Sequence, residues 1–137
     1  MDNVNSVADQ EHGIVRMRSP HSVAATMERL ESLLKQRGII VFARIDFSGD
    51  AARAGLAMRP EQLLIFGNPK GGTPLMLAAP TAGLDLPFKA LAWENEQGET
   101  WIACNDPRYI VRRHGLAPAL AANLAVIMPI IEQATQP

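Results

Sequence analysis

Two parts of the chain carry apolar residues at the spacing of an amphipathic helix. Four apolar residues between residues 23 and 37 follow at intervals of four, three and four: Val23, Met27, Leu30 and Leu34. The same intervals recur between residues 118 and 131: Leu120, Leu124, Ile127 and Ile131. This spacing predicts two helices that each pack one face against a core. Pro129 is expected to kink or end the second helix.

Short apolar runs bounded by turn residues predict five β-strands. They cover residues 14–18, 39–46, 62–66, 88–94 and 99–104. The polar turn at residues 95–98 joins the last two strands into a predicted hairpin. Residues 47–58 fit either a short helix or a loop, and residues 81–87 are expected to be irregular.

The order of these elements predicts one α+β domain over residues 14–137, an antiparallel sheet with helices packed on one face. Residues 1–13 are polar and are predicted to form a flexible leader. The other face of such a sheet meets either water or a second subunit. Met, Phe and Trp residues on the strands favour a cover, so we expect a homodimer.

The segment at residues 63–76 is the leading candidate for a binding site. An apolar strand leads into a turn with paired glycines, and Thr73-Pro74 is then typical of the N-cap and first residue of a helix. Free N–H groups at a helix start, beside a lysine, are typical of anion binding. The candidate residues are Asn68, Lys70, Gly71, Gly72 and Thr73. Alternatively, the glycines only shape a structural turn; the order of a P-loop is absent, because Lys70 precedes them.

A second set of polar residues is expected to gather at one end of the sheet. Asp46 and Asn105 each end a predicted strand, and Lys89 lies within one. A buried Lys89 beside Asp46 would form a pair with altered pKa values, as found in active sites. Alternatively, Lys89 faces solvent. Asp106 and the following proline are predicted to be the N-cap and first residue of a short helix.

The single cysteine, Cys104, excludes an intrachain disulfide and fits a reducing compartment. Its position at a strand end predicts a buried apolar role rather than a nucleophile. The three histidines, His12, His21 and His114, are too widely spaced for a zinc pattern. We therefore expect no metal and no cofactor, and a cytoplasmic protein without a secretion signal.

The composition is that of a globular domain, with 137 residues, 47% hydrophobic and 20% charged. A net charge of -1 and a pI near 6.3 argue against nucleic acid as a partner. The apolar region near the C-terminus falls short of the roughly 20 residues of a membrane span, so no membrane association is expected.

Several short motifs follow one another in a fixed order along the chain. They are Pro20-His21-Ser22 and residues 43–46, 59–60 with 63–70, 72–76, 85–89 and 105–109. In this pattern, which runs from about residue 14 to 115, the chain resembles the DUF302 family of small bacterial and archaeal proteins. The resemblance implies a two-layer TBP-like β-α-β4-α domain, no assigned activity, and a binding or accessory role. Phe47 and Cys104 depart from the family pattern, where His and an aromatic residue are common.

These observations favour a non-catalytic module that binds a small anion or a protein. The alternative is an enzyme acting on a small anionic molecule, with Asp46 and Lys89 as its acid and base. A concave pocket with converging titratable groups would distinguish the enzyme from the binding module.

Overall fold

Six strands form one sheet in the order β1-β2-β6-β5-β4-β3, and every neighbouring pair is antiparallel. The computed structural model describes residues 6–9 and 11–137. The strands are β1 (Ser6–Asp9), β2 (Ile14–Ser19), β3 (Ile40–Asp46), β4 (Glu61–Gly67), β5 (Phe88–Glu94) and β6 (Thr100–Asn105). The five strands after β1 confirm the predicted ones, and β5 and β6 form the predicted hairpin.

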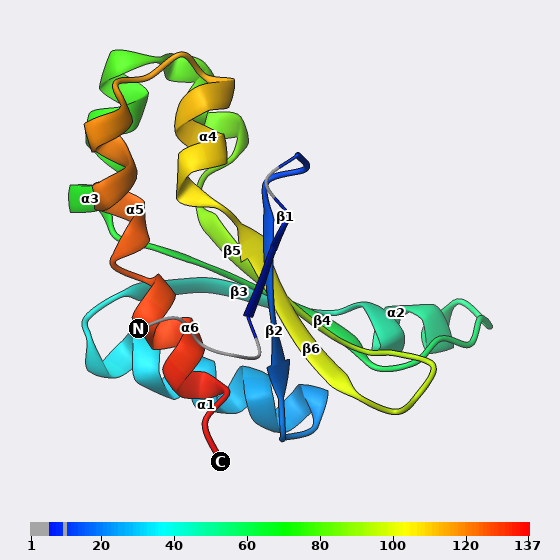
Figure 1. The fold of residues 1–137 in the computed structure, drawn as a ribbon. Coiled ribbons are helices and arrows are strands. Elements are labelled where there is room, and N and C mark those ends of the chain that lie inside the picture. The colour runs from blue at the N-terminus through cyan, green and yellow to red at the C-terminus, as the bar shows by residue number, and fades with distance from the viewer. Residues whose placement is uncertain (1–5, 10) are drawn as a thin grey trace.

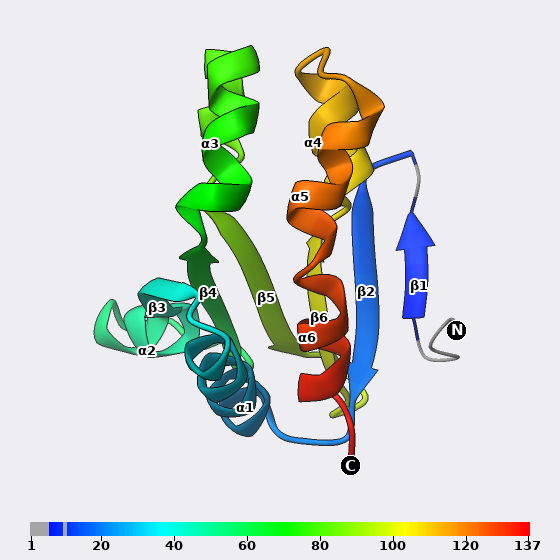
Figure 2. The ribbon, with the colours of Figure 1, turned by 90° about the vertical axis from the view of Figure 1, so that its left-hand side faces the viewer.

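Helices cover one face of this sheet, as predicted (Figures 1 and 2). They are α1 (Val23–Gln36), α2 (Phe47–Arg53), α3 (Pro69–Ala78), α4 (Pro107–Arg113), α5 (Ala122–Ala125) and α6 (Met128–Ala134), with the 3-10 helices η1 (Pro80–Leu84) and η2 (Pro118–Ala121). Helices α1 and α6 lie over the sheet, while α3, α4 and α5 rise beyond one end of it (Figure 2). The α+β fold class is therefore confirmed. In the described residues, none of the helices combines the length and the apolar character that a membrane span requires.

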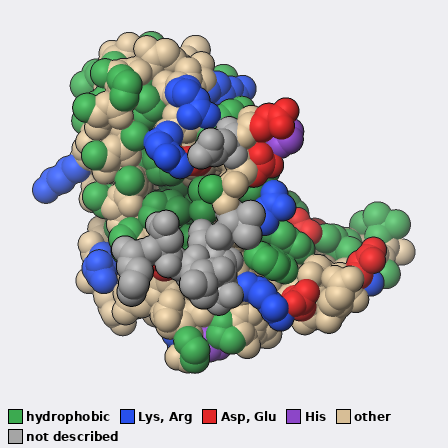
Figure 3. All heavy atoms as spheres, viewed as in Figure 1, with side chains coloured by type: hydrophobic (Ala, Val, Ile, Leu, Met, Phe, Trp, Pro, Cys, Tyr) green, Lys and Arg blue, Asp and Glu red, His purple; other side chains and the backbone are tan. Residues whose placement is uncertain are grey.

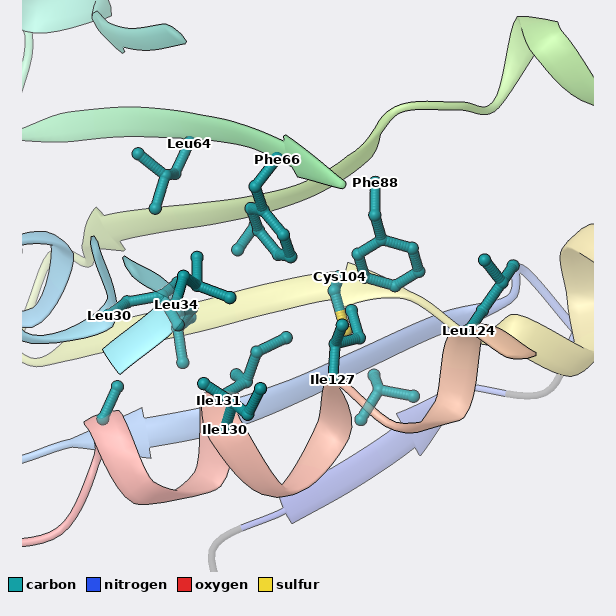
Figure 4. Close-up of a cluster of buried hydrophobic side chains, with 14 of the residues drawn as sticks. Leu30, Leu34, Leu64, Phe66, Phe88, Cys104, Leu124, Ile127, Ile130 and Ile131 are labelled. Carbon is teal, nitrogen blue, oxygen red and sulfur yellow. The ribbon is translucent and has the colours of Figure 1, made fainter. Parts of the chain in front are cut away.

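Helix α1 forms as its sequence predicts, because its cap and its apolar stripe agree. The Ser22 hydroxyl accepts a hydrogen bond from the Ala25 N–H, 3.1 Å away, and so caps the first turn. The stripe that includes Leu30 and Leu34 is fully buried. Figure 4 shows these side chains converging with those of β4, β5, α5 and α6. Phe66 and Phe88 lie in this core with their rings tilted and 5.9 Å between centroids.

The opposite side of the sheet, here called the outer face, carries a largely apolar surface. Its side chains alternate along each strand with the buried ones. Eight of them are apolar and partly exposed: Ile14, Ala43, Ile45, Leu63, Ile65, Leu91, Trp93 and Trp101. Helices α1, α5 and α6 lie on the other side of the sheet (Figure 2).

The structure corrects three of the predicted elements. Residues 6–9 are not a loose leader but form strand β1, which pairs with β2. Without β1, the edge of β2 would leave backbone N–H and C=O groups without partners. Residues 1–5 and 10 of that predicted leader lie outside the described residues. The helix predicted from residue 118 is divided into η2, α5 and α6, with Pro129 in the first turn of α6. The third correction concerns α3.

Candidate functional site

Helix α3 begins earlier than predicted, and its first turn contains the candidate residues. Asn68, not Thr73, is the N-cap: its side-chain oxygen accepts from the Lys70 N–H at 3.0 Å. The N–H groups of Gly71 and Gly72 both donate to the Asn68 carbonyl, at 2.9 and 3.1 Å. These three N–H groups therefore have partners within the chain, and the amide donors expected to face an anion are already used. The prediction failed because paired glycines and Pro74 resemble a turn and a helix start.

Gly71 lies in the helix because another backbone approaches it closely. A Cβ atom at this position would lie 2.9 Å from the carbonyl oxygen of Asn123, in α5. The Asn123 side-chain amide also lies 3.5 Å from the Gly71 carbonyl. The glycine thus permits α3 and α5 to pack against one another.

A pocket of about 260 Å³ opens beside this contact. Four separate segments line it: Ile39 and Phe42 at β3, residues 67–76, residues 86–88, and residues 123–127. Phe42 lies at the register shift between Val41 and Ala43 in β3, and a bulge of this kind redirects a side chain. Phe42, Met76 and Val126 lie among the exposed apolar residues of the chain, and most of the lining is apolar.

Three side chains of the pocket wall are polar. Asn68, Thr73 and Asn123 are its polar side chains, and the lining contains no acidic residue. Two lysines flank the pocket without lining it. Lys70 lies between the lining residues Pro69 and Gly71, and its side chain is exposed. Lys89 Nζ lies 3.3 Å from the carbonyl oxygen of Pro87, which lines the pocket.

The remaining candidate residues do not form one site. Ile40, at the start of β3, pairs with Gly67 beside the pocket, whereas Asp46 ends the same strand and pairs with Gln62. Asp46 therefore lies about 20 Å from the pocket end of the sheet. The expected gathering of Asp46 with Lys89 and Asn105 is wrong, because β3 is seven residues long and Asp46 lies at the end away from the pocket.

Asp46 instead caps helix α2 and has local partners. Its carboxylate accepts from the Ser48 hydroxyl at 2.6 Å and from the Gly49 N–H at 3.0 Å. These two hydrogen bonds lower the pKa of Asp46 below its ordinary value. Lys89 belongs to the outer face, since Phe88 and Ala90 on either side of it are buried. The two residues therefore do not form the acid and base pair that the enzyme alternative requires.

Asn105 and Asp106 lie at the same end of the sheet as the pocket, two strands away from β4. Asp106 is the predicted N-cap of α4: it accepts from the Arg108 N–H at 2.9 Å and pairs with the Arg108 guanidinium at 2.8 Å. Burial raises the pKa of Asp106, but hydrogen bonds from Arg108 and its charge outweigh burial, and the pKa lies below its ordinary value.

Cys104 has the buried role that its position predicts. It is 6% exposed, and its Sγ lies 3.7 Å from Met128 Sδ in α6. Burial, with a smaller contribution from Asp106, raises the pKa of this thiol to about 12. The thiolate needed for a nucleophile is therefore disfavoured. Within the described part of the chain, no group of three or more His, Cys, Asp or Glu residues is placed to hold a metal ion.

Residues distant in the sequence supply most of the pocket, and the sequence patterns did not identify them. The one available signal was Asn123, a polar residue inside the apolar region near the C-terminus. The sequence patterns also did not identify a second polar cluster, because its residues are distant from one another in the sequence. His114, at the end of α4, lies 2.6 Å from the Asp85 carboxylate and 2.9 Å from the Thr81 hydroxyl, which joins α4 to η1.

Comparison with known proteins places this fold in a family. The model of the domain of unknown function DUF302 matches residues 15–134. The chain belongs to the DUF302 family. An uncharacterised DUF302 protein from Bacillus stearothermophilus has a similar solved structure, with a TM-score of 0.74 over 90% of this chain and 95% of that chain. At 24% identity, this likeness concerns the fold alone.

Three curated proteins from Brucella are similar to this chain. Over 116 residues, or 85% of this chain, it is 45% identical to a protein of Brucella suis biovar 1 (strain 1330) named fluoride-specific ion channel FluC 1. It is equally identical to FluC 2 of Brucella melitensis biotype 1. The chain spans less than half the length of these relatives, 45% and 42% respectively.

Proposed function

We propose that this DUF302 chain is a non-catalytic binding module whose pocket takes a small ligand with an apolar body and an acidic end. The pocket at the α3–α5 contact carries this proposal. Its volume of about 260 Å³ is close to the lower end of the range for small-molecule sites, roughly 300–1,000 Å³. An apolar wall with a few polar groups at one part is typical of such sites.

The polar groups and charges around the pocket support an acidic end on the ligand. Asn68, Thr73 and Asn123 offer amide and hydroxyl groups to a carboxylate. Lys70 follows the lining residue Pro69 in the chain, and the lining contributes no negative charge that would repel an anion. Of the earlier alternatives, a compact anion held by backbone N–H groups is less well supported, because the amides of residues 70–72 have internal partners.

The channel names of the Brucella relatives belong to proteins of which this chain matches less than half. Fluoride is a small, strongly hydrated anion that needs several donors to replace its water. The apolar wall of this pocket does not supply them, so the proposal for this chain is an amphiphilic carboxylate. The module is proposed to act in the cytoplasm.

Thermal unfolding with a panel of small molecules tests the proposal. The panel compares octanoate and benzoate with octanol, inorganic phosphate and fluoride. A carboxylate at about 100 times its Kd adds roughly 2.7 kcal/mol of stability. For a domain of this size, that is a rise in Tm on the order of 5–10 °C. Octanol is expected to give a smaller rise, and phosphate and fluoride none.

Two matched pairs of variants then assign the response to the pocket. Met76→Trp fills the opening, whereas Leu77→Trp makes the same change one residue away, at a side chain that is 81% exposed and outside the lining. Only Met76→Trp is expected to abolish the rise. Lys70→Ala is expected to reduce the rise in Tm with octanoate but not the rise with octanol. Lys35→Ala is expected to change neither rise. Absence of any rise with octanoate or benzoate in the unmodified protein would contradict the proposal.

A further inference from the structure

Four side chains form a row across the four inner strands of the sheet, near the end of those strands that lies away from the pocket. Arg18 in β2 pairs with Trp101 in β6, Trp101 with Trp93 in β5, and Trp93 with Glu61 in β4. This set, here called the central row, therefore runs from positive charge through two aromatic rings to negative charge. Arg18 is exposed, and the other three side chains are partly exposed.

We propose that the outer face is the contact surface of a symmetric homodimer. The midline of the six-stranded sheet lies between β6 and β5. A two-fold axis parallel to the strands along this midline places β2 over β4 of the second copy, and β6 over its β5. Arg18 then faces Glu61 of the partner subunit, and Trp101 faces Trp93 of the partner subunit. A two-fold interface requires a surface that complements itself, and the central row does so.

The neighbouring rows obey the same symmetry. In the next row on the same face, two residues further along each strand, Ala103 pairs with Leu91 and Leu91 pairs with Leu63. The rotation places Ala103 over the partner's Leu91, where apolar groups meet, and Arg16, which pairs with Ala103, over the partner's Leu63.

In the next row, Ile14 pairs with Asn105 and Ile65 with Lys89. The same rotation places Ile14 over the partner's Ile65 and Asn105 over the partner's Lys89, so that polar groups also meet one another. None of these pairs opposes two like charges.

A two-fold axis across the strands does not match the surface. An axis across the strands, through the row of Arg16 and Ala103, would place Arg16 over the partner's Arg16. It would also place Trp101 over the partner's Asn105. Like charges that meet at an interface are unfavourable. The charge pattern therefore selects the axis parallel to the strands.

The size and chemistry of the outer face fit a second copy of the chain. Six strands about 4.8 Å apart, with about six residues each, give a footprint of roughly 600 Å² before the relief of the side chains is counted. A stable interface buries about 800 Å² on each partner. Tryptophan is enriched in the core of such interfaces, and a charged rim gives them specificity.

Exchange of the two charges provides the test. Arg18→Glu and Glu61→Arg each place like charges opposite one another at both ends of the row, and each is expected to raise the dimer Kd at least tenfold. An equimolar mixture of the two variants can form a heterodimer in which every pair is again opposite in sign. Its Kd is expected to return to within about threefold of the unmodified protein, as measured by sedimentation equilibrium.

Two controls separate this contact from other effects. Lys35→Glu makes the same change of charge on α1, on the helix side, and is expected to leave the Kd unchanged. Arg18 also pairs with Glu99 in its own chain, so the Tm of each variant is measured to verify folding. Recovery on mixing cannot come from this internal pair, since each chain retains its own substitution.

Tryptophan fluorescence gives an independent measurement. The chain has two tryptophans, and both belong to the central row. Dilution through the Kd is therefore expected to shift the emission to longer wavelength as both rings become hydrated. A single-chain mass at all concentrations up to 500 μM would overturn the proposal. A dimer that both single variants retain, or a mixture that stays dissociated, would overturn it as well.

Discussion

Two adjacent glycines of α3, Gly71 and Gly72, have different surroundings. Alanine substitutions at the two positions should therefore have different effects on the stability of the protein. Gly71→Ala would place a Cβ atom 2.9 Å from the Asn123 carbonyl oxygen, which belongs to a backbone and cannot rotate away. Gly72→Ala would place its Cβ atom 3.6 Å from the nearest neighbour, which belongs to the flexible Leu86 side chain. Neither glycine has a positive φ angle, so alanine is not strained by the backbone itself.

The two substitutions share one favourable effect and differ in one unfavourable effect. Alanine in place of a helical glycine reduces the entropy of the unfolded chain, which stabilises by about 0.5–1 kcal/mol. At Gly71 the contact is about 0.5 Å shorter than the 3.4 Å at which ordinary contact begins, so α5 must move away from α3. Overpacking of this kind costs about 1–3 kcal/mol. Gly72→Ala should therefore stabilise the protein, and Gly71→Ala should destabilise it by up to about 2 kcal/mol.

Urea denaturation followed by circular dichroism measures both free energies of unfolding under the same conditions. The expected difference between the variants is about 1–3 kcal/mol, or a Tm difference on the order of 3–10 °C. Because the two variants share composition and helix, each controls for the other. If their free energies of unfolding agree within about 0.5 kcal/mol, the close approach of α3 to α5 is not a constraint on the fold.

Three further predictions concern single side chains. Asp106→Ala should cost about 1 kcal/mol through loss of a helix cap. Because Arg108 lowers the folded pKa of Asp106, the contribution of Asp106 to stability is complete above about pH 4 and is lost as the pH falls through the folded pKa. The free energy of unfolding of the variant should therefore fall less steeply with acid than that of the unmodified protein. Cys104 should resist iodoacetamide at pH 8 in the native protein and react in urea; rapid native labelling would contradict the pKa of about 12. Asn68→Ala should cost about 1 kcal/mol in urea denaturation by removing the cap of Lys70, and an unchanged midpoint would exclude that role.

The sequence predicted the elements whose local signals and packing agree. The stripe through Leu30 and Leu34 predicted α1, and the two apolar runs on either side of the polar turn at residues 95–98 predicted the hairpin. The start of α3 could not be predicted in this way. Gly71 is suited locally to a turn and occurs in a helix because of Asn123, which is 52 residues away in the sequence.

The candidate site was predictable only in the segment that the motif covers. Asn68 and Thr73 line the pocket, but Phe42 and Val126 come from other parts of the chain, and no local spacing joins them. The wrong placement of Asp46 has the same origin. Which end of a strand meets which neighbour depends on the order of the strands in the sheet, and that order is not encoded in any single segment.

Helix α6 has a consequence for synthesis of the protein on the ribosome. Ile130 and Ile131 complete the core over α1, and Arg29 of α1 donates to the carbonyl of Ala134 at 3.1 Å. Domains fold as units while the chain emerges, N-terminal part first. The side of α1 that faces α6 must therefore wait for residues about 100 positions later before it is covered. During that interval the nascent chain presents an open binding surface for chaperones, and slow translation of its last third would prolong this exposure.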